Sequence, residues 1–134
     1  MICSVVIDTN VIVSSNISSG GKPAEIMKLF YAGKLQMFYS LEIISEYKRV
    51  LTYKKLNIGV ETQNDIIKAL EIGGILIEPP KSNIPLIDET DRTFYDTAKS
   101  SKAFLITGNS RHYPDEPFIM TPAEFMRVYK ECFI

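Results

Sequence analysis

The chain has 134 residues, of which 46% are hydrophobic and 23% charged, and its formal net charge at pH 7 is -1. These values are typical of one globular domain over residues 1–134, long enough to bury a core without disulfides. The near-zero charge excludes a global field that attracts nucleic acid or an anionic membrane, so a polyanion would have to be met by a local patch.

The two cysteines and the N-terminus bear on where the protein works. Cys3 and Cys132 are too few for a disulfide framework, so we expect two buried free thiols in a reducing compartment. The N-terminus has no basic segment followed by a long apolar core, and no apolar run approaches the roughly 20 residues of a membrane-spanning helix. We therefore expect a cytoplasmic protein with no membrane partner.

Short apolar segments alternate with amphipathic ones along the chain, which is typical of strands followed by helices. Helix starts are marked by Pro23, by Ser40 as an N-cap and by the capping box that begins at Thr121, whereas the glycines at 73–74 end a helix. In chain order, the predicted elements are a strand at 3–7, a flexible serine- and glycine-rich loop at 14–21, a helix from 23 to about 32, a strand at 35–40, helices at 41–51 and 60–74, a strand at 75–78, a loop at 78–85, a short helix at 91–101, strands at 103–107 and 117–120, and a helix at 121–132.

Buried strands that alternate with helices predict an α/β fold. We expect a three-layer α/β/α sandwich around a mostly parallel sheet of four to five strands. Ligands of such sheets bind beyond the carboxyl ends of the strands. Asp8 follows the first strand directly, in the segment VVIDTN, and so lies at that edge. A carboxylate at the end of a buried strand costs free energy unless a cation or a hydrogen-bond donor meets it.

Further acids can share this edge of the sheet. Glu46 projects beside the apolar stripe of its helix, where it could equally turn outward to solvent. Asp91 falls within the inward stripe of the helix at 91–101, although a first-turn acid also suits the helix dipole. Asp88 is interpreted as a helix cap and Asp96 as a solvated acid on the outer face.

The segment ITGN after the fourth strand adds polar groups. Thr107 and Asn109 flank a glycine at the same edge as Asp8, with a plain turn as the alternative, and Asn10 could simply cap the turn after the first strand. Carboxylates about 4 Å apart repel by roughly 4 kcal/mol at an effective dielectric near 20, so gathered acids either raise their pKa values or hold a cation. Oxygen ligands favour Mg²⁺ or Mn²⁺ over zinc, and such an ion suits phosphodiester hydrolysis.

With these segments in place, the sequence resembles the PIN domain family. The segments VVIDTNVIVSS, SLEIISEYKRVL, DETDRTFYDTAKSSKAFLITGN and HYPDEPFIMTPAEFM resemble, in order and separation, the toxin-like PIN proteins of bacterial and archaeal toxin–antitoxin pairs, and they cover nearly the whole chain. By this resemblance, Asp8, Glu46 and Asp91 match the three family acids, Asn10 and Thr107 match supporting polar residues, and Asn109 stands where the family often has a further acid.

The resemblance implies a metal-dependent endoribonuclease that cleaves single-stranded RNA with Mg²⁺ or Mn²⁺ held by the three acids. It also implies a small antitoxin over the acidic groove and a homodimer. The neutral Asn109 brings no charge to a second metal, which leaves a non-catalytic PIN-fold interaction module as an alternative. A phosphatase or phospho-acceptor domain is disfavoured, because the residues after Asp8 lack a second acid and no lysine follows the last strand.

Side chains that could meet RNA are scattered along the sequence. A basic residue can contact a phosphate and a tyrosine can stack on a base, but each alone is better explained as a solvated or partly buried side chain. The candidates at the expected rim are Lys22, Lys48, Arg49, Arg92 and Arg111, with Tyr47, Tyr95 and Tyr113.

Overall fold

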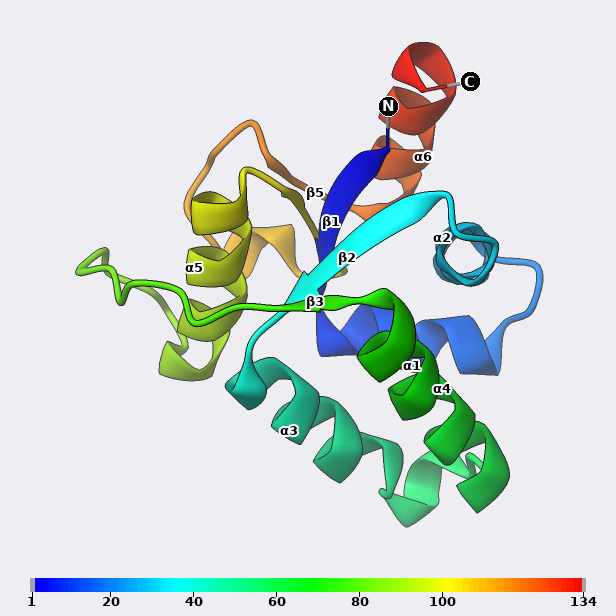
Figure 1. The fold of residues 1–134 in the computed structure, drawn as a ribbon. Helices are drawn as coiled ribbons and strands as arrows, with labels where there is room; N and C mark the ends of the chain where they lie inside the picture. Colours follow the sequence, from blue (N-terminus) through cyan, green and yellow to red (C-terminus); the bar gives the residue numbers. More distant parts are fainter. Residues whose placement is uncertain (1, 134) are drawn as a thin grey trace.

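Five parallel strands form the centre of the fold in the computed structural model, which describes residues 2–133 (Figure 1). They are ordered β3-β2-β1-β4-β5, and every neighbouring pair is parallel. The predicted α/β fold with a parallel sheet is confirmed. The strands are β1 (Cys3–Ile7), β2 (Leu35–Tyr39), β3 (Ile75–Leu76), β4 (Phe104–Ile106) and β5 (Ile119–Met120).

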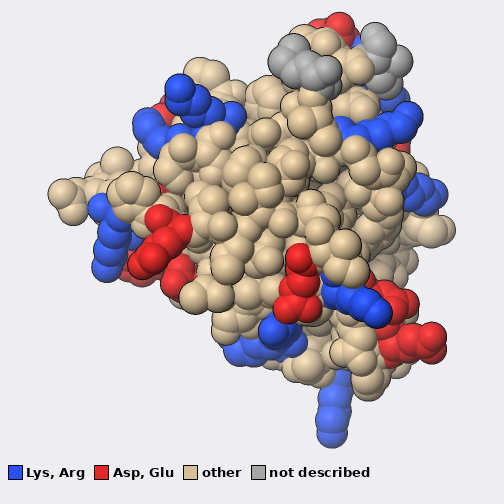
Figure 2. Space-filling view, viewed as in Figure 1, with Lys and Arg blue, Asp and Glu red and all other residues tan. Residues whose placement is uncertain are grey.

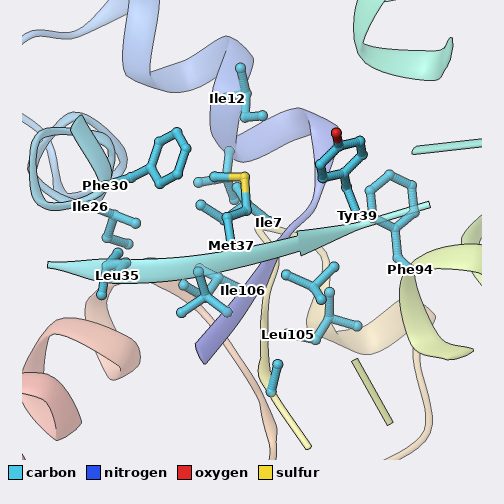
Figure 3. Packing of buried hydrophobic residues seen from close by; sticks show 14 of the residues in the cluster. Ile7, Ile12, Ile26, Phe30, Leu35, Met37, Tyr39, Phe94, Leu105 and Ile106 are labelled. Carbon is cyan, nitrogen blue, oxygen red and sulfur yellow. The ribbon is translucent and has the colours of Figure 1, made fainter. Parts of the chain in front are cut away.

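Helices cover both faces of the sheet and make three layers. Figure 3 shows α1 and α2 on one side of β2 and α6 on the other, and α5 packs against β1, β2 and β4. The helices are α1 (Thr9–Ile17), α2 (Lys22–Tyr31), α3 (Leu41–Leu51), α4 (Val60–Gly73), α5 (Arg92–Ser101) and α6 (Pro122–Cys132), with short 3₁₀ turns η1 (Lys54–Leu56), η2 (Glu89–Asp91) and η3 (Ser110–His112).

The central strand β1 is apolar throughout because both of its faces are covered. Val5, Val6 and Ile7 are fully buried, and Val5 pairs with Met37 of β2 on one side and Phe104 of β4 on the other. Figure 3 shows side chains from the helical layers closing over the strands at this point. The carboxyl end of β1 therefore holds the residue after Ile7 in a fixed place.

The predicted helix starts agree with the structure. The Ser40 hydroxyl accepts a hydrogen bond from the amide of Ile43 at 3.1 Å, and Thr121 and Glu124 form a complete capping box. Helix α4 ends at Gly73, where two glycines interrupt the helical pattern.

The loop predicted over residues 14–21 is confirmed at 18–21 and wrong at 14–17, since α1 begins directly after Asp8 and continues to Ile17. Val11 and Ile12 are buried and give this helix its inward face. The polar residues that suggested a loop bond to the helix itself: Ser15 Oγ and Asn16 Nδ2 donate to the Ile12 carbonyl at 2.6 and 2.9 Å. Strand β1 thus passes into α1 with Asp8 between them.

Two smaller expectations also differ from the structure. Strand β3 covers only Ile75 and Leu76, because the prolines at 79–80 cannot donate to a ladder and the chain leaves the sheet edge. Cys3 is a buried free thiol as predicted, but Cys132 is free and exposed, because it stands on the outer side of the last turn of α6. Within residues 2–133, no helix has the length and apolar character needed to cross a membrane.

Candidate active site

Asp8 meets hydrogen-bond donors from the opposite end of the chain. Its carboxylate is buried, and Oδ2 accepts from the hydroxyls of Thr107 at 2.8 Å and Tyr113 at 3.1 Å. Its main-chain N–H donates to the Ile106 carbonyl at 2.9 Å, which ties the end of β1 to the end of β4. Burial raises the pKa of Asp8, and the two hydroxyl donors oppose that rise only in part.

Glu46 comes from α3 and faces the same edge of the sheet instead of turning to solvent. The hydroxyl of Thr9, the first residue of α1, donates to its carboxylate. Arg49 Nη2 stands 3.8 Å from Glu46 Oε1, which is too long for a hydrogen bond, and 60% of the arginine side chain is exposed. Glu46 is therefore oriented by Thr9 and is not neutralised by a close arginine.

Asp91 lies at the junction of η2 and α5, half-buried beside the other acids. Burial, followed by the negative charges of Asp8, Asp88 and Glu46, raises its pKa from 3.8 to about 6, and the charge of His112 opposes this rise. Asp91 lines the same cavity as Asp8 and Glu46. The structure thus brings the three predicted acids to one place.

The polar residues after β1 and β4 lock these two strand ends together. Asn10 Oδ1 accepts from the Gly108 N–H at 3.0 Å, and Thr107 Oγ1 accepts from the Asn109 N–H at 3.0 Å while it donates to Asp8. A Cβ at Gly108 would stand 3.2 Å from Asn10 Oδ1, so the close approach favours glycine there. The ITGN segment is a support for Asp8 and not only a turn.

These side chains line a cavity of about 470 Å³ at the carboxyl ends of the strands. An adjoining hollow of about 610 Å³ is lined by Glu46 but not by Asp8 or Asp91. The smaller cavity is therefore the candidate site for a cation held by all three acids. The polar residues of the smaller cavity are Asp8, Thr9, Asn10, Ser14, Glu46, Asp88, Thr90, Asp91, Asn109 and His112.

The donor set of the cavity fits a hard divalent cation in its chemistry. Carboxylate and amide oxygens dominate, no cysteine lines the cavity, and burial raises the pKa of both Asp8 and Asp91, a penalty that a bound cation relieves. Across residues 2–133, however, no three His, Cys, Asp or Glu side chains are close enough to form a ready-made metal site. The carboxylates line the same cavity, but they are not close enough to one another to hold one ion without moving.

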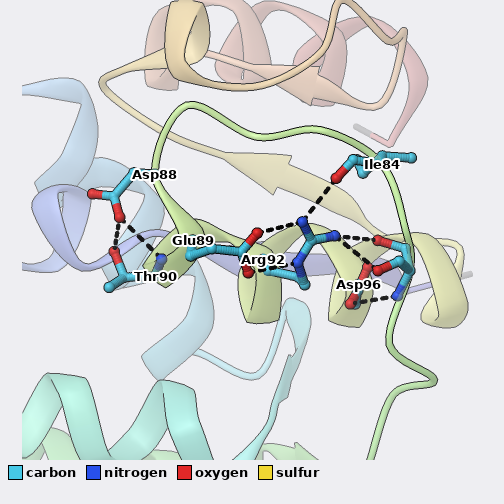
Figure 4. Close-up of polar contacts among 7 residues, drawn as sticks. Ile84, Asp88, Glu89, Thr90, Arg92 and Asp96 are labelled. Carbon is cyan, nitrogen blue, oxygen red and sulfur yellow. Dashed lines mark hydrogen bonds and ion pairs between the residues drawn. The ribbon is translucent and has the colours of Figure 1, made fainter.

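Asp96 is not the solvated acid that was predicted, since it is only 5% exposed. The loop at 77–88 folds back over α5, and the Ser82 N–H donates to Asp96 Oδ2 at 3.1 Å. Arg92 holds the same loop, donating to the carbonyls of Ser82 and Ile84 at 2.9 and 2.8 Å and pairing with Glu89 (Figure 4). Asp96 and Arg92 are therefore both engaged in holding this loop and not in binding a cation or a substrate in the cavity.

Asp88 caps η2 as predicted, with Oδ1 accepting from the Thr90 N–H at 3.0 Å, and it also lines the cavity (Figure 4). Tyr47, Tyr95 and Tyr113 were considered as groups that stack on a base, with burial as the alternative, and the structure confirms burial. Tyr47 and Tyr95 lie on the inward sides of α3 and α5, and Tyr113 follows η3 and packs in the hydrophobic core.

The sequence interpretation missed five other residues that line the cavity. They are Val13, Val50, Tyr53, Lys55 and Leu56, from α1, the end of α3 and η1. Tyr53 is 41% exposed, unlike the tyrosines that were considered. Its position just after a helix, next to two lysines in the segment TYKKL, is a signal of an exposed aromatic that the sequence does contain.

Comparison with known proteins confirms the resemblance at the level of the PIN domain family. Residues 4–111 match the PIN domain family, a range that includes all the predicted site residues. A protein of Methanocaldococcus jannaschii, described only as uncharacterized, is 33% identical over 108 residues, which cover 78% of this chain and 70% of the relative.

Proposed function

This chain belongs to the PIN domain family, whose members are in general nucleases that use divalent metal, and from that premise we propose that it is a metal-dependent endoribonuclease of the toxin type. Its proposed substrate is single-stranded RNA, met in the cytoplasm, and its proposed reaction is hydrolysis of a phosphodiester bond. The observation that best supports this proposal is the gathering of Asp8, Glu46 and Asp91 in one cavity at the strand ends.

Mg²⁺ or Mn²⁺ would be held by those three carboxylates. A cation there supplies Lewis-acid polarisation of the phosphodiester and neutralises charge that develops during hydrolysis. The chain's own residues orient the ligands: Thr107 and Tyr113 fix Asp8 through their hydroxyls, and Thr9 fixes Glu46. Within residues 2–133 no three of these acids form a ready-made site, so cation binding would require the carboxylates to move closer together.

The protein presents no broad basic surface on the face drawn in Figure 2, where lysines and arginines are scattered around uncharged areas. With a net charge of -1, RNA binding is expected to depend on local contacts at the cavity. The cation is expected to be required for cleavage.

The direct test uses purified protein with an unstructured and a structured RNA, in Mg²⁺ and in EDTA. We expect cleavage of the unstructured RNA in Mg²⁺ only, and none by Asp8→Asn, whose amide oxygen can still accept from Thr107 and Tyr113. Asp65→Asn, on the exposed side of α4, is the matched control and should keep full activity. Cleavage that survives Asp8→Asn or persists in EDTA would contradict the proposal.

Asn109 supports a second candidate, an interaction module that keeps the fold without the chemistry. Its side chain lines the cavity but brings no negative charge, and an amide oxygen is a weaker ligand for a hard cation than a carboxylate. Calorimetry with Mn²⁺ separates the two candidates. Absence of binding at millimolar Mn²⁺ favours the interaction module, whereas binding that Asp91→Asn weakens favours the nuclease.

A small antitoxin and a second copy of the chain complete the proposal. The antitoxin would cover the acidic cavity, and the protein would form a homodimer. Expression of the chain alone should slow growth of the host cell, and the Asp8→Asn variant should not. Light scattering after gel filtration measures the oligomeric state, and a monomer at micromolar concentration would refute the dimer while leaving the nuclease intact.

A further inference from the structure

Two chemically different sets of residues line the cavity. Asp8, Glu46 and Asp91 are the carboxylates, and Val50 lies one helical turn after Glu46 on α3. Tyr53, Lys55 and Leu56 follow the end of α3, and with Val50 and Val13 they make up what we call the second end of the cavity. We propose that this second end is a nucleotide subsite, in which the Tyr53 ring stacks on one base of single-stranded RNA and Lys55 meets a neighbouring phosphate. The subsite rests on the proposed function, because it positions the same strand whose phosphodiester lies at the carboxylates.

Tyr53 is held in place by the turn that follows α3. Its N–H donates to the Val50 carbonyl at 3.0 Å, and its own carbonyl accepts from the Leu56 N–H at 3.0 Å. Asn57 closes the turn in the left-handed region, with φ 54°, and donates from its N–H to the Lys54 carbonyl at 3.1 Å. The ring is thus presented by a hydrogen-bonded turn and not by a free loop.

Arg49 connects the two ends of the cavity. Nη1 donates to the Tyr53 hydroxyl at 3.2 Å, and Nη2 of the same guanidinium stands 3.8 Å from Glu46. The hydroxyl is therefore engaged at its edge, while 41% of the residue remains exposed. Among the described residues that line the cavity, Tyr53 is the sole tyrosine, phenylalanine or tryptophan, and it offers a larger ring to a base than the imidazole of His112 does.

The chemistry of this end matches a nucleotide better than a peptide or an ion. An aromatic ring beside aliphatic side chains accepts the flat face of a base, and a lysine on the same wall accepts a phosphate. The cavity volume of about 470 Å³ lies in the range of roughly 300–1,000 Å³ that is usual for sites of small ligands.

Electrostatics adds a reason for such a subsite. The carboxylates repel the phosphates of RNA until a cation is bound, so affinity without metal has to come from elsewhere in the cavity. Lys55 and the stacking face of Tyr53 are the groups of the cavity wall that attract a nucleotide under that condition. Binding in EDTA therefore measures the subsite separately from the metal.

The test is fluorescence anisotropy of a short fluorescein-labelled single-stranded RNA with the full chain, in EDTA at low ionic strength. We expect Tyr53→Ala to weaken binding by roughly 5- to 150-fold, the range found when one stacked base is lost, and Tyr53→Phe to retain it. Tyr31→Ala is the matched control, since Tyr31 is 52% exposed on α2 and does not line the cavity. Lys55→Ala should weaken binding and reduce its salt dependence, whereas Lys54→Ala, one residue away and also exposed, should do neither.

An RNA with one abasic position separates stacking from a structural effect of the substitution. If the ring stacks on that base, the abasic RNA and the Tyr53→Ala variant should each weaken binding by a similar factor. The Tyr53→Ala variant should then bind the abasic RNA no more weakly than it binds the intact RNA. Wild-type binding that Tyr53→Ala leaves unchanged overturns the subsite, and so does cleavage in Mg²⁺ by a protein that does not bind RNA in EDTA. Tyr53-dependent binding without any cleavage in Mg²⁺ refutes the proposed nuclease and leaves the subsite standing.

Discussion

Replacement of Asp91 by asparagine should stabilise the protein in the absence of metal. The pKa of Asp91 is raised from 3.8 to about 6, so the folded state binds this proton more tightly than the unfolded state does. Its contribution to stability is therefore greatest below about pH 4 and is lost as the pH rises towards 6, when the carboxyl must ionise beside the other acids. Each pKa unit corresponds to about 1.36 kcal/mol, which gives an upper bound of about 3 kcal/mol.

Solvent in the open cavity screens this repulsion, so we expect Asp91→Asn to gain about 1–2 kcal/mol at about pH 7.5. The melting temperature in EDTA should rise by roughly 3–10 °C, and the gain should vanish at about pH 4. Circular dichroism against temperature at both pH values measures this, with Asp65→Asn as the neutral control. With Mn²⁺ the difference should shrink or reverse, because the wild type binds the ion better. A gain of equal size at both pH values, or no gain at all, would refute charge repulsion as the cause.

Three further substitutions test the hydrogen bond to Asp8, the lining of the cavity and the attachment of the loop at 77–88. Thr107→Val removes a buried donor to Asp8 and should lower the unfolding free energy in urea by about 1–3 kcal/mol, whereas Thr107→Ser should retain most of it; equal stability of the two variants would contradict this role. Asn109→Asp should tighten Mn²⁺ binding in calorimetry and lower the melting temperature in EDTA, and unchanged affinity would place this residue out of reach of the cation. Arg92→Ala leaves carbonyls of the 77–88 loop without a donor and should cost about 1–3 kcal/mol and speed proteolysis of that loop. RNA cleavage by the folded Arg92→Ala protein should stay at the wild-type level, and its loss would show that the guanidinium serves the cavity after all.

Most of the fold follows from local patterns in the sequence. The runs of β-branched residues, the caps at Ser40 and Thr121 and the two glycines after α4 each mark an element by local chemistry, and the structure agrees with them. Helix α1 was missed because its serines and Asn16 favour loops when considered alone. Burial of Val11 and Ile12 against the sheet outweighs that preference, and burial is decided by tertiary packing.

The candidate site also contains some residues that the sequence places correctly and others that it does not. Asp8 and Thr107 could be placed from sequence because each directly follows a strand, and parallel strands end at one edge. The burial of Asp96 could not be predicted, because it depends on the path of the loop at 77–88, which has no repeating pattern. The exposure of Tyr53 has a signal in the segment TYKKL, but its place in the cavity depends on the turn after α3, whose path has no repeating pattern either.

The hydroxyls that hold Asp8 stand 99 and 105 residues further along the chain. During synthesis Asp8 leaves the ribosome long before Thr107 and Tyr113 are made. A chain that stops before these residues therefore has Asp8 without the two hydroxyls that donate to it. The buried setting of Asp8 therefore forms only after β4 and η3 have been synthesised and have folded against β1.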